Sequence, residues 1–145
     1  MLLSGGAGIT AMLTMLEHLA THHTDSREVL FIHAARGRER HAFNREVRSY
    51  RASRPGIKVI VLYEQTGPED RLGEHHDAVG RVTTEMLRSH LPQRQADVYF
   101  CGPPGFMSAM EYALEELNIP ADRRHSEVFG PDPSFATGEL TEAVA

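Results

Sequence analysis

Residues 1–16 have the sequence Met1-Leu2-Leu3-Ser4-Gly5-Gly6-Ala7-Gly8-Ile9-Thr10-Ala11-Met12-Leu13-Thr14-Met15-Leu16, the pattern of a short apolar strand, a glycine turn and an amphipathic helix. Residues 6–11 within it match the spacing G-x-G-x-x-G/A. The helix N-terminus would offer a phosphate its free N–H groups and the positive end of its dipole. The motif predicts a phosphate-binding turn, with a turn that binds nothing as the open alternative.

Each small residue of this turn has an expected role. Gly6 makes the tight turn, Gly8 lets a pyrophosphate approach the backbone, and Ala11 packs the helix on the strand. A branched side chain at Gly8 would then lie where the pyrophosphate approaches. We expect Gly8→Val to abolish nucleotide binding with little loss of fold.

Composition indicates one globular domain. The chain has 145 residues, of which 41% are hydrophobic and 24% charged. Its net charge of −5 disfavours a nucleic-acid partner. No apolar run approaches the roughly 18 residues that span a bilayer, and the start lacks the basic region of a signal peptide. We therefore expect a cytoplasmic location and no membrane partner. The single cysteine, Cys101, excludes an internal disulfide framework.

Apolar periodicity divides the rest of the chain into alternating strands and helices. Strands after the first are expected over 29–32, 57–63, 97–101 and 124–129. Helices are expected over 9–21, 38–52, from a cap at Thr83 or Thr84 to 91, and from Phe106 to Leu117. Residues 64–81 form a long polar loop, of a length that is more often functional than idle. This alternation predicts an α/β fold, a doubly wound five-stranded parallel sheet with helices on both faces.

Three segments should meet at the carboxyl edge of this sheet, where doubly wound proteins bind their ligands. They are residues 5–10 after the first strand, 101–105 after the fourth, and 127–131 after the fifth. The opening strand has only about three residues before its turn, fewer than the usual five or six. We therefore expect the chain to be part of a longer protein.

Several motifs together resemble the nicotinamide-binding half of the ferredoxin–NADP reductase superfamily, and within it the flavohaemoglobins. The motifs are Ser4-Gly5-Gly6-Ala7-Gly8-Ile9-Thr10-Ala11-Met12-Leu13, His33-Ala34-Ala35, His41-Ala42-Phe43, Tyr63-Glu64-Gln65, Cys101-Gly102-Pro103-Pro104-Gly105-Phe106-Met107 and His125-Ser126-Glu127-Val128-Phe129-Gly130-Pro131. The resemblance covers residues 1–131 and implies an NAD(P)-binding reductase domain, followed by a flexible tail over 132–145.

The resemblance also implies cofactors and partners. The domain would bind NADH and pass a hydride to FAD, which is held mostly by a barrel domain absent from this chain. In a whole flavohaemoglobin the flavin passes electrons to a globin haem, which turns nitric oxide and oxygen into nitrate. An FAD-binding barrel and possibly a globin domain are therefore the expected partners, with haem only in the globin.

Site residues follow from the same motifs. Cofactor-binding residues would be Gly6, Ala7, Gly8, Ile9, Thr10, Ala11, Arg36, Gly102, Pro103, Val128, Phe129, Gly130 and Pro131. Cys101 and Glu127 would be the catalytic residues, Cys101 shaping the space beside the nicotinamide ring and Glu127 tuning charge at the flavin edge, with Phe129 on the ring system. In the alternatives, Cys101 is a small buried hydrophobe and the last strand simply frays at the sheet edge.

The chain departs from the family pattern at two positions. Ala11 stands where the family often has proline, and alanine still meets the need for a small residue. Arg36 follows the second strand, where an acidic residue would favour NADH and an arginine can accept a 2′-phosphate. We expect a preference for NADH, while Arg36, Arg38 and Arg40 fit a solvated basic face better than a specific phosphate site.

Nine histidines raise the question of a metal site. His18 and His22 stand four residues apart on a predicted helix, a spacing that suits a ligand pair. No carboxylate is spaced to join them, so a solvated polar face explains them better and we expect no metal.

Three functions compete. The leading one is the NAD(P)H-binding module of a flavohaemoglobin. A second is the reductase component of an iron–sulfur oxygenase system, which would usually append a ferredoxin with clustered cysteines. The third is a non-catalytic nucleotide-sensing domain, which would keep the glycine turn without needing Glu127 and Phe129.

Overall fold

The computed structural model describes residues 1–22, 27–91 and 96–128. Its elements in chain order are β1 (Leu2–Gly5), the 3₁₀ turn η1 (Gly6–Gly8), α1 (Ile9–His22), β2 (Val29–Ala35), η2 (Arg38–Arg40), α2 (Asn44–Ser53), β3 (Ile57–Tyr63), β4 (Ala78–Val79), α3 (Thr84–His90), β5 (Val98–Cys101), α4 (Pro104–Glu116), η3 (Ala121–Arg123) and β6 (Arg124–Glu127).

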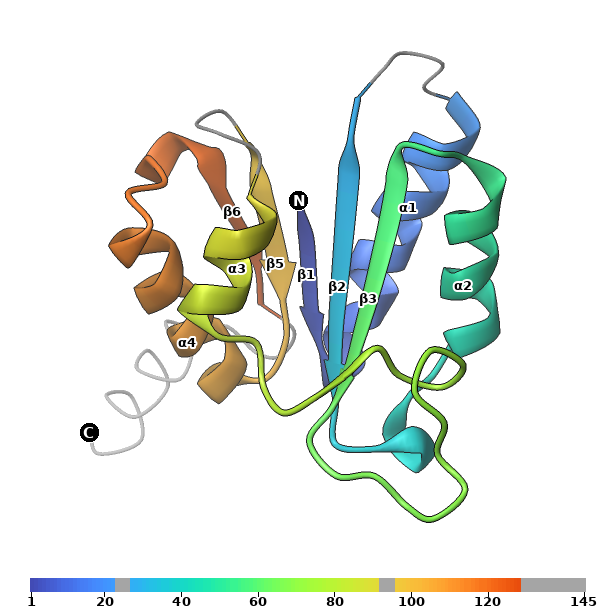
Figure 1. The fold of residues 1–145 in the computed structure, drawn as a ribbon. Helices are drawn as coiled ribbons and strands as arrows, with labels where there is room; N and C mark the ends of the chain where they lie inside the picture. Colours follow the sequence, from blue (N-terminus) through green and yellow to red (C-terminus); the bar gives the residue numbers. More distant parts are fainter. Residues whose placement is uncertain (23–26, 92–95, 129–145) are drawn as a thin grey trace, which may run out of the picture.

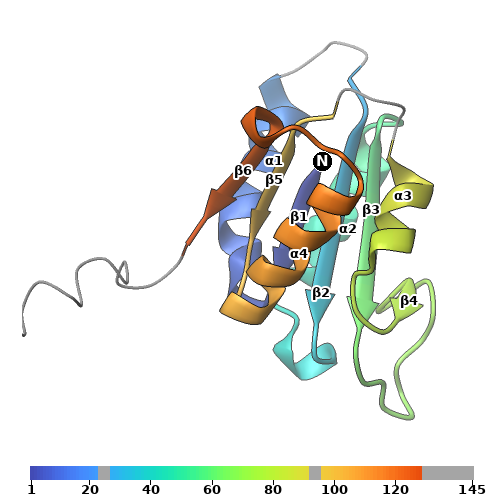
Figure 2. The same cartoon turned by 90° about the vertical axis from the view of Figure 1, so that its left-hand side faces the viewer.

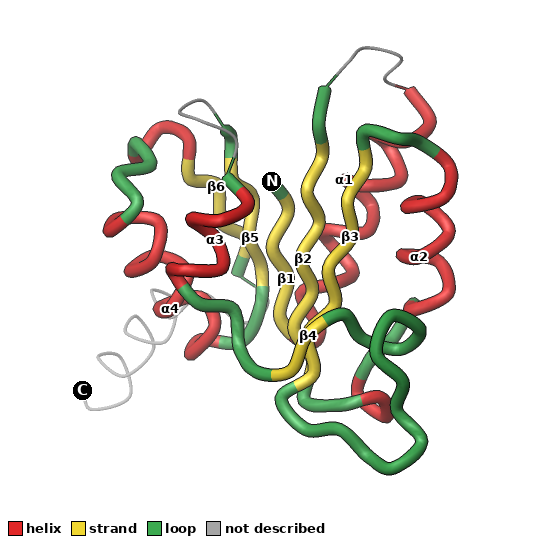
Figure 3. The backbone as a smooth tube through the Cα atoms, in the orientation of Figure 1, coloured by secondary structure: helices red, strands yellow, loops and turns green. Residues whose placement is uncertain are grey.

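All strand pairs in the sheet are parallel, and the strand order is β4-β3-β2-β1-β5-β6 (Figure 1). The chain first builds outward from β1 to β4, and then returns to the other side of β1 with β5 and β6 (Figure 3). The strand order therefore reverses between β1 and β5. At such a switch point the two connecting loops leave toward opposite faces, which opens space for a ligand at the carboxyl ends of the strands.

Helices cover both faces of the sheet, α1 and α2 on one and α3 and α4 on the other (Figure 2). Alternation along each strand divides the core accordingly: Leu2 and Phe31 pack with the α1 and α2 side, whereas Leu3 and Ile32 pack with the other. All four are at most 2% exposed. Burying a side chain of this size stabilises the fold by about 1.5–3 kcal/mol, so the two cores hold the layers together.

The fold class predicted from sequence is confirmed, with differences in detail. A short sixth strand, β4, pairs with the end of β3 inside the segment expected to be a loop. The helix expected over 38–52 begins only at Asn44, because Phe43 adopts a left-handed conformation with φ of 60°. Thr83 caps α3 as expected, accepting a hydrogen bond from the Met86 N–H at 3.2 Å.

Some expectations lie outside the described residues, namely the end of the last strand at Phe129 and the tail over 132–145. Within the described ranges, no helix is long and apolar enough to cross a membrane. In the same ranges no three His, Cys, Asp or Glu side chains gather closely enough to hold a metal ion. The rings of His18 and His22 stack on each other, with centroids 4.6 Å apart.

Candidate functional site

The glycine turn lies at the switch point, between the ends of β1 and β5. Gly6 has φ of +49°, the left-handed region that glycine enters without strain, and an added Cβ would meet only the Pro103 ring, at ordinary contact distances of 3.7 and 3.9 Å. This conformation reverses the chain so that α1 can begin at Ile9 directly after the turn. The expected role of Gly6 as the tight-turn residue therefore agrees with its geometry.

Gly8 differs from expectation. A Cβ atom added there would lie 2.0 Å from the carbonyl oxygen of Cys101 and 2.4 Å from its carbonyl carbon. Those are backbone atoms of a paired central strand, so they cannot move aside as the end of a side chain could. Gly8 is thus required for packing the turn on β5, and the expectation that Gly8→Val would spare the fold is wrong.

The ring of Phe106, near the start of α4, rests on two other glycines. A Cβ atom added to Gly5 would lie 2.7 Å from the Phe106 ring, and one added to Gly102 would lie 2.5 Å from it. Gly5 ends β1 and Gly102 follows β5, so one aromatic ring packs across both strand ends. The absence of side chains at these glycines lets α4 approach the switch point closely.

The start of α1 fits the pyrophosphate of a dinucleotide. Ala7 and Thr10 are exposed there, and the first turn of α1 carries no acidic residue. Ile9 points into the core and is 2% exposed, while Ala11 packs partly buried against the same core. Uncharged, exposed backbone at the N-terminus of a 14-residue helix is the surface that binds phosphate in proteins.

Both predicted catalytic residues belong to one row across the sheet. Cys101 on β5 is in register with Glu127 on β6 and with Ser4 on β1, and Ser4 is in register with His33 on β2. Because parallel strands in register place their side chains on the same face, this row runs beneath the glycine turn from one half of the sheet to the other.

Cys101 is fully buried, with 0% of its surface exposed. Burial raises the pKa of its thiol, and the nearby Glu127 carboxylate raises it further. The thiol therefore stays protonated at neutral pH and is no nucleophile. Shape and weak polarity are what it can contribute.

The remaining predicted residues lie on two sides of Cys101. Pro103 is exposed and Gly102 half-buried just after β5, while Glu127 and Val128 are exposed at the end of β6, which is the edge strand. The structure therefore brings Gly6–Gly8, Cys101–Pro103 and Glu127 to one end of the sheet, as the sequence predicted. Phe129, Gly130 and Pro131 lie outside the described residues.

Arg36 lies farther along the same edge, directly after β2. Its side chain is exposed, and it forms no ion pair with any other residue in the ranges described. The backbone of Arg36 is held by the residues that follow β3, because the Gln65 N–H donates to its carbonyl at 2.9 Å. A free cation at this position can meet the ribose 2′ position of a dinucleotide.

Arg38 has a different setting. With Arg71 it lines an open hollow of about 410 Å³, whose other lining residues are Pro68, Glu69, Glu74 and His75. Arg71 is itself 3.7 Å from Glu74, in an exposed ion pair. The mixed charges of this hollow suit a solvated surface better than a specific phosphate site.

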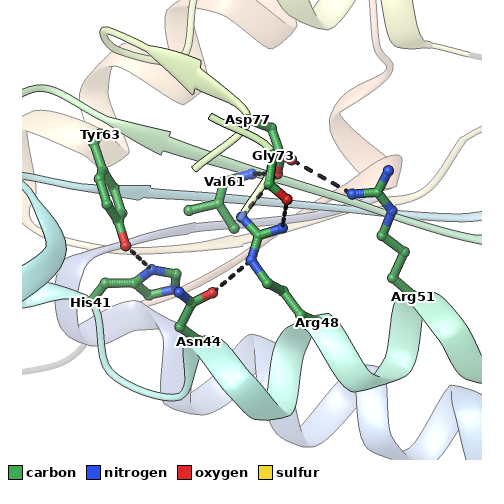
Figure 4. A network of polar contacts seen from close by, with 8 residues as sticks. All are labelled: His41, Asn44, Arg48, Arg51, Val61, Tyr63, Gly73 and Asp77. Atoms are coloured by element: carbon green, nitrogen blue, oxygen red, sulfur yellow. Dashed lines mark hydrogen bonds and ion pairs between the residues drawn. The ribbon is translucent and has the colours of Figure 1, made fainter. Parts of the chain in front are cut away.

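A buried polar cluster lies under the Arg36 side of the edge. His33 Nδ1 is hydrogen-bonded to Ser4 Oγ at 2.8 Å, and the rings of His33 and His41 lie 4.8 Å apart. His41 Nδ1 is in turn 2.8 Å from the Tyr63 hydroxyl (Figure 4). His76 stacks on the other side of the Tyr63 ring, with a centroid distance of 5.2 Å.

Burial keeps His33 and His41 neutral. Desolvation, with a smaller contribution from His41, lowers the pKa of His33 from 6.5 to about 3. Desolvation and then the positive charge of Arg48 lower the pKa of His41 to about 4. Burial also raises the pKa of Tyr63. At neutral pH the side chains of His33, His41 and Tyr63 thus carry no charge.

Asp77 connects the long loop after β3 to β3 and α2 (Figure 4). Its carboxylate accepts a hydrogen bond from the Val61 N–H at 2.9 Å and lies 3.6 Å from both Arg48 and Arg51 of α2. Arg48 also donates to the Gly73 carbonyl at 3.4 Å. The loop after β3 is therefore held against α2 from two points.

The sequence did not single out this polar cluster as part of the site. His33, His41 and Tyr63 each belong to a motif of the family resemblance, but nothing in those motifs indicated that their side chains meet. The side chains that meet come from five separate segments of the chain, and no local sequence pattern predicts such a contact.

A glycine turn at the switch point of a parallel sheet covered on both faces defines a doubly wound nucleotide-binding domain. The chain belongs to the oxidoreductase NAD-binding domain family, whose match covers residues 2–112. The resemblance found in its sequence motifs is thereby confirmed.

Relatives in sequence are flavohemoproteins. The flavohemoprotein of Deinococcus radiodurans is 44% identical over 135 residues, 93% of this chain and 33% of that protein. The flavohemoprotein of Bordetella pertussis is 42% identical over 129 residues, 89% of this chain and 32% of that protein. The chain thus spans about a third of the length of these curated relatives.

Solved structures agree. The flavohemoglobin from Malassezia yamatoensis, with bound FAD and heme, has a TM-score of 0.74 at 27% identity, over 89% of this chain and 31% of that one. The FAD/NAD-binding domain of nitric oxide dioxygenase from Vibrio cholerae has a TM-score of 0.71 at 30% identity, over 90% of this chain and 50% of that one. The cytochrome b5 reductase domain of Ulva prolifera nitrate reductase, 18% identical with a TM-score of 0.74, shares the fold.

Proposed function

We propose that this chain is the NAD(P)H-binding module of a flavoprotein reductase, which delivers a hydride to FAD held by a further domain. The observation that carries this proposal is the joining of the glycine turn and the end of β5 at the switch point, with Gly8 packed on Cys101. That contact sets the pyrophosphate turn next to the residues proposed to face the nicotinamide.

In this proposal each part of the edge has one task. Residues 6–11 bind the pyrophosphate through backbone N–H groups. When bound, NAD(P)H supplies the hydride and FAD accepts it. Cys101, buried and protonated, limits the space beneath the nicotinamide, and Gly102 and Pro103 form its wall. Glu127, exposed at the end of β6, places negative charge at the flavin side. Val128, Phe129, Gly130 and Pro131 are included from sequence alone.

The wider activity rests on the relatives. Flavohemoproteins are about three times as long as this chain, and one flavohemoglobin was solved with FAD and heme. A relative from Vibrio cholerae is described as a nitric oxide dioxygenase. We therefore propose an FAD-binding barrel and a globin as partners, with nitric oxide dioxygenation at the globin haem as the final reaction. A cytoplasmic location stays a prediction.

NADH is proposed as the preferred nucleotide. The resemblance of the sequence motifs to flavohaemoglobins supports it, whereas the exposed Arg36, which forms no ion pair within the described ranges, favours a 2′-phosphate. A 2′-phosphate bound by Arg36 would gain about 1.5–3 kcal/mol, which corresponds to roughly tenfold to a hundredfold in affinity.

Reconstitution tests this function. The 145-residue chain alone should be colourless, bind NADH in calorimetry and leave acceptors unreduced. Mixed with a separately made FAD-containing barrel domain from a flavohemoprotein relative, it should restore NADH oxidation, because hydride transfer needs the two rings within about 3–3.5 Å. Glu127→Gln and Phe129→Ala should change flavin reduction and leave nucleotide binding unchanged.

Other outcomes would identify other functions. A chain that arrives yellow, or reduces acceptors at full rate alone, would place the flavin site inside these residues and overturn the proposal. Nucleotide binding without any reconstituted oxidation would favour a sensing domain. Oxidation that couples only to an iron–sulfur protein would favour the oxygenase reductase.

A further inference from the structure

Three sequence motifs that the proposed site leaves unused meet at one point. They are His33-Ala34-Ala35 at the end of β2, His41-Ala42-Phe43 before α2, and Tyr63-Glu64-Gln65 at the end of β3. The His33 and His41 rings lie 4.8 Å apart, and His41 Nδ1 is 2.8 Å from the Tyr63 hydroxyl (Figure 4). His41 is the link between the other two.

His33 and Tyr63 do not reach a ligand on the surface, and the Nε2 atom of the partly exposed His41 is buried as well. His33 and Tyr63 are both 0% exposed. Tyr63 is covered on one side by His76, which is itself 4% exposed. Any effect of the cluster on a bound nucleotide must therefore pass through the segment that it holds in place.

That segment runs from Arg36 to Arg40. Its Arg36, Arg38, Glu39 and Arg40 side chains are all exposed, whereas the next residue, His41, turns inward and is only partly exposed. At one end the Gln65 N–H holds the Arg36 carbonyl at 2.9 Å. At the other end the side chain of His41 is bonded to Tyr63.

The backbone just beyond this segment is also strained. Phe43 has φ of 60°, although it is a bulky residue and its side chain is 44% exposed. A non-glycine residue keeps such a conformation only where its surroundings impose it. Phe43 lies between the inward-turned His41, two residues earlier, and the start of α2 at Asn44.

The partner of His41 is itself fixed. Tyr63 is the last residue of β3 and is in register with Ala35, the last residue of β2. The loop that covers Tyr63 is tied to α2 through Asp77, Arg48 and Arg51. The Tyr63 hydroxyl is therefore held in place. Its hydrogen bond to His41 in turn restrains the end of the segment from Arg36 to Arg40.

We propose that His41 and Tyr63 are positioning residues for the adenosine end of the nucleotide site: the bond between them holds residues 36–40 against β3, and thereby sets how Arg36 meets the ribose 2′ position. This rests on the proposed function, because it presumes that a dinucleotide binds at the carboxyl edge with its adenosine beyond β2.

Tyr63→Phe tests the proposal, because it removes the hydroxyl and keeps the ring that stacks on His76. Tyr112→Phe is the matched control, since its hydroxyl bonds Glu116 at 3.1 Å on α4, away from the edge. The probes are 2′,5′-ADP and 5′-AMP, which occupy only the adenosine end, and nicotinamide mononucleotide, which does not reach it. Affinities are measured by calorimetry on the 145-residue chain.

The affinity for 2′,5′-ADP relative to 5′-AMP should fall by about threefold to tenfold in Tyr63→Phe, the range expected for one lost hydrogen bond. Nicotinamide mononucleotide should bind as before, and Tyr112→Phe should change nothing. An unchanged relative affinity in Tyr63→Phe would overturn the proposal. Absence of binding of any probe to the wild type would instead refute the proposed function.

Substitution at the other partner separates positioning from packing. His41→Asn keeps a polar group where Nδ1 lies and should retain the wild-type ratio, whereas His41→Leu should match Tyr63→Phe. Combining His41→Leu with Tyr63→Phe should add nothing further. The nitrogen NMR signal of His41 Nδ1 should shift in Tyr63→Phe and stay in Tyr112→Phe. Additive effects, or a loss in His41→Asn equal to that in His41→Leu, would contradict the assigned role.

Discussion

The two ends of the carboxyl edge are built in different ways. Between β1 and β5 the site is made of backbone: Gly8 packs on the Cys101 carbonyl, and Gly5 and Gly102 lie under the Phe106 ring. Between β2 and β3 it is made of side chains, and the bond between His41 and Tyr63 holds the backbone of Arg36–Arg40 in place.

Because of this difference, the two ends of the edge should respond differently to amino-acid substitution and to pH. At the backbone end the limit is space, so a substitution either clashes or is harmless. At the side-chain end the limit is charge and hydrogen bonding, so pH and isosteric substitutions change the site gradually. The predictions below compare the two ends, in order of decreasing effect.

The largest effect is expected at Gly8. In Gly8→Ala the new Cβ would overlap the Cys101 carbonyl, so the free energy of unfolding should fall by about 3 kcal/mol. Urea unfolding measures it. Gly105→Ala is the control, because nothing lies within 4 Å of a Cβ there and alanine suits a helix better. Equal stability of the two variants would show that the backbone end has room to adjust.

Acid should weaken the side-chain end. His33 and His41 have folded-state pKa values of about 3 and about 4, against 6.5 when unfolded, so the unfolded chain binds more protons between these values. Stability is therefore complete above pH 6.5 and is lost as pH falls below it. From pH 6 to pH 5 the two histidines together should cost about 2 kcal/mol.

Unfolding in urea at pH 5 and pH 6 checks this pH dependence. His41→Asn should remove close to half of the histidine contribution, whereas His90→Asn, which alters an exposed histidine at the end of α3, should leave the loss as in the wild type. A pH dependence that is the same in both variants would mean that His41 titrates normally in the folded state.

Cofactor choice should respond to Arg36. Reversing its charge in Arg36→Glu should lower the affinity for NADPH relative to NADH by roughly tenfold, since a charge-assisted hydrogen bond is lost and a repulsion gained. Calorimetry with both nucleotides measures the ratio. The same reversal at Arg40, which is also exposed, should leave it near the wild-type value. Equal effects at both positions would indicate a diffuse basic face.

The smallest effect is expected at Gly6, within the backbone end. Gly6→Ala has room for its Cβ but must keep φ near +49°, which should cost about 1 kcal/mol. Gly6→Asn should cost less, because asparagine tolerates this conformation better. Thermal unfolding of both variants measures the difference. A loss at Gly6 as large as that at Gly8 would show that space is limiting there as well.

Sequence alone predicted much of the backbone end. Glycine spacing, apolar runs and the Thr83 cap are local patterns, and local patterns locate strands, turns and helix starts. It missed that Gly8 is also required for packing, because the atom that Gly8 must avoid belongs to Cys101, far along the chain. It also missed β4, whose two residues are too few to show a period. The cluster of His33, His41 and Tyr63 depends on contacts between segments, which no local pattern encodes.

The strand order also bears on how the domain folds. Ser4 of β1 is paired with His33 of β2 on one side and with Cys101 of β5 on the other. The pairing of β1 with β5 therefore closes a far longer loop of chain than the pairing with β2. Closing longer loops costs more chain entropy, so we expect β2 and β3 to join β1 before β5 does. Pulse-labelled hydrogen exchange should show amides of β2 protected earlier than those of β5. The side of the edge that carries Arg36 would then be ordered first. The glycine turn would pack against β5 only in the last stage of folding.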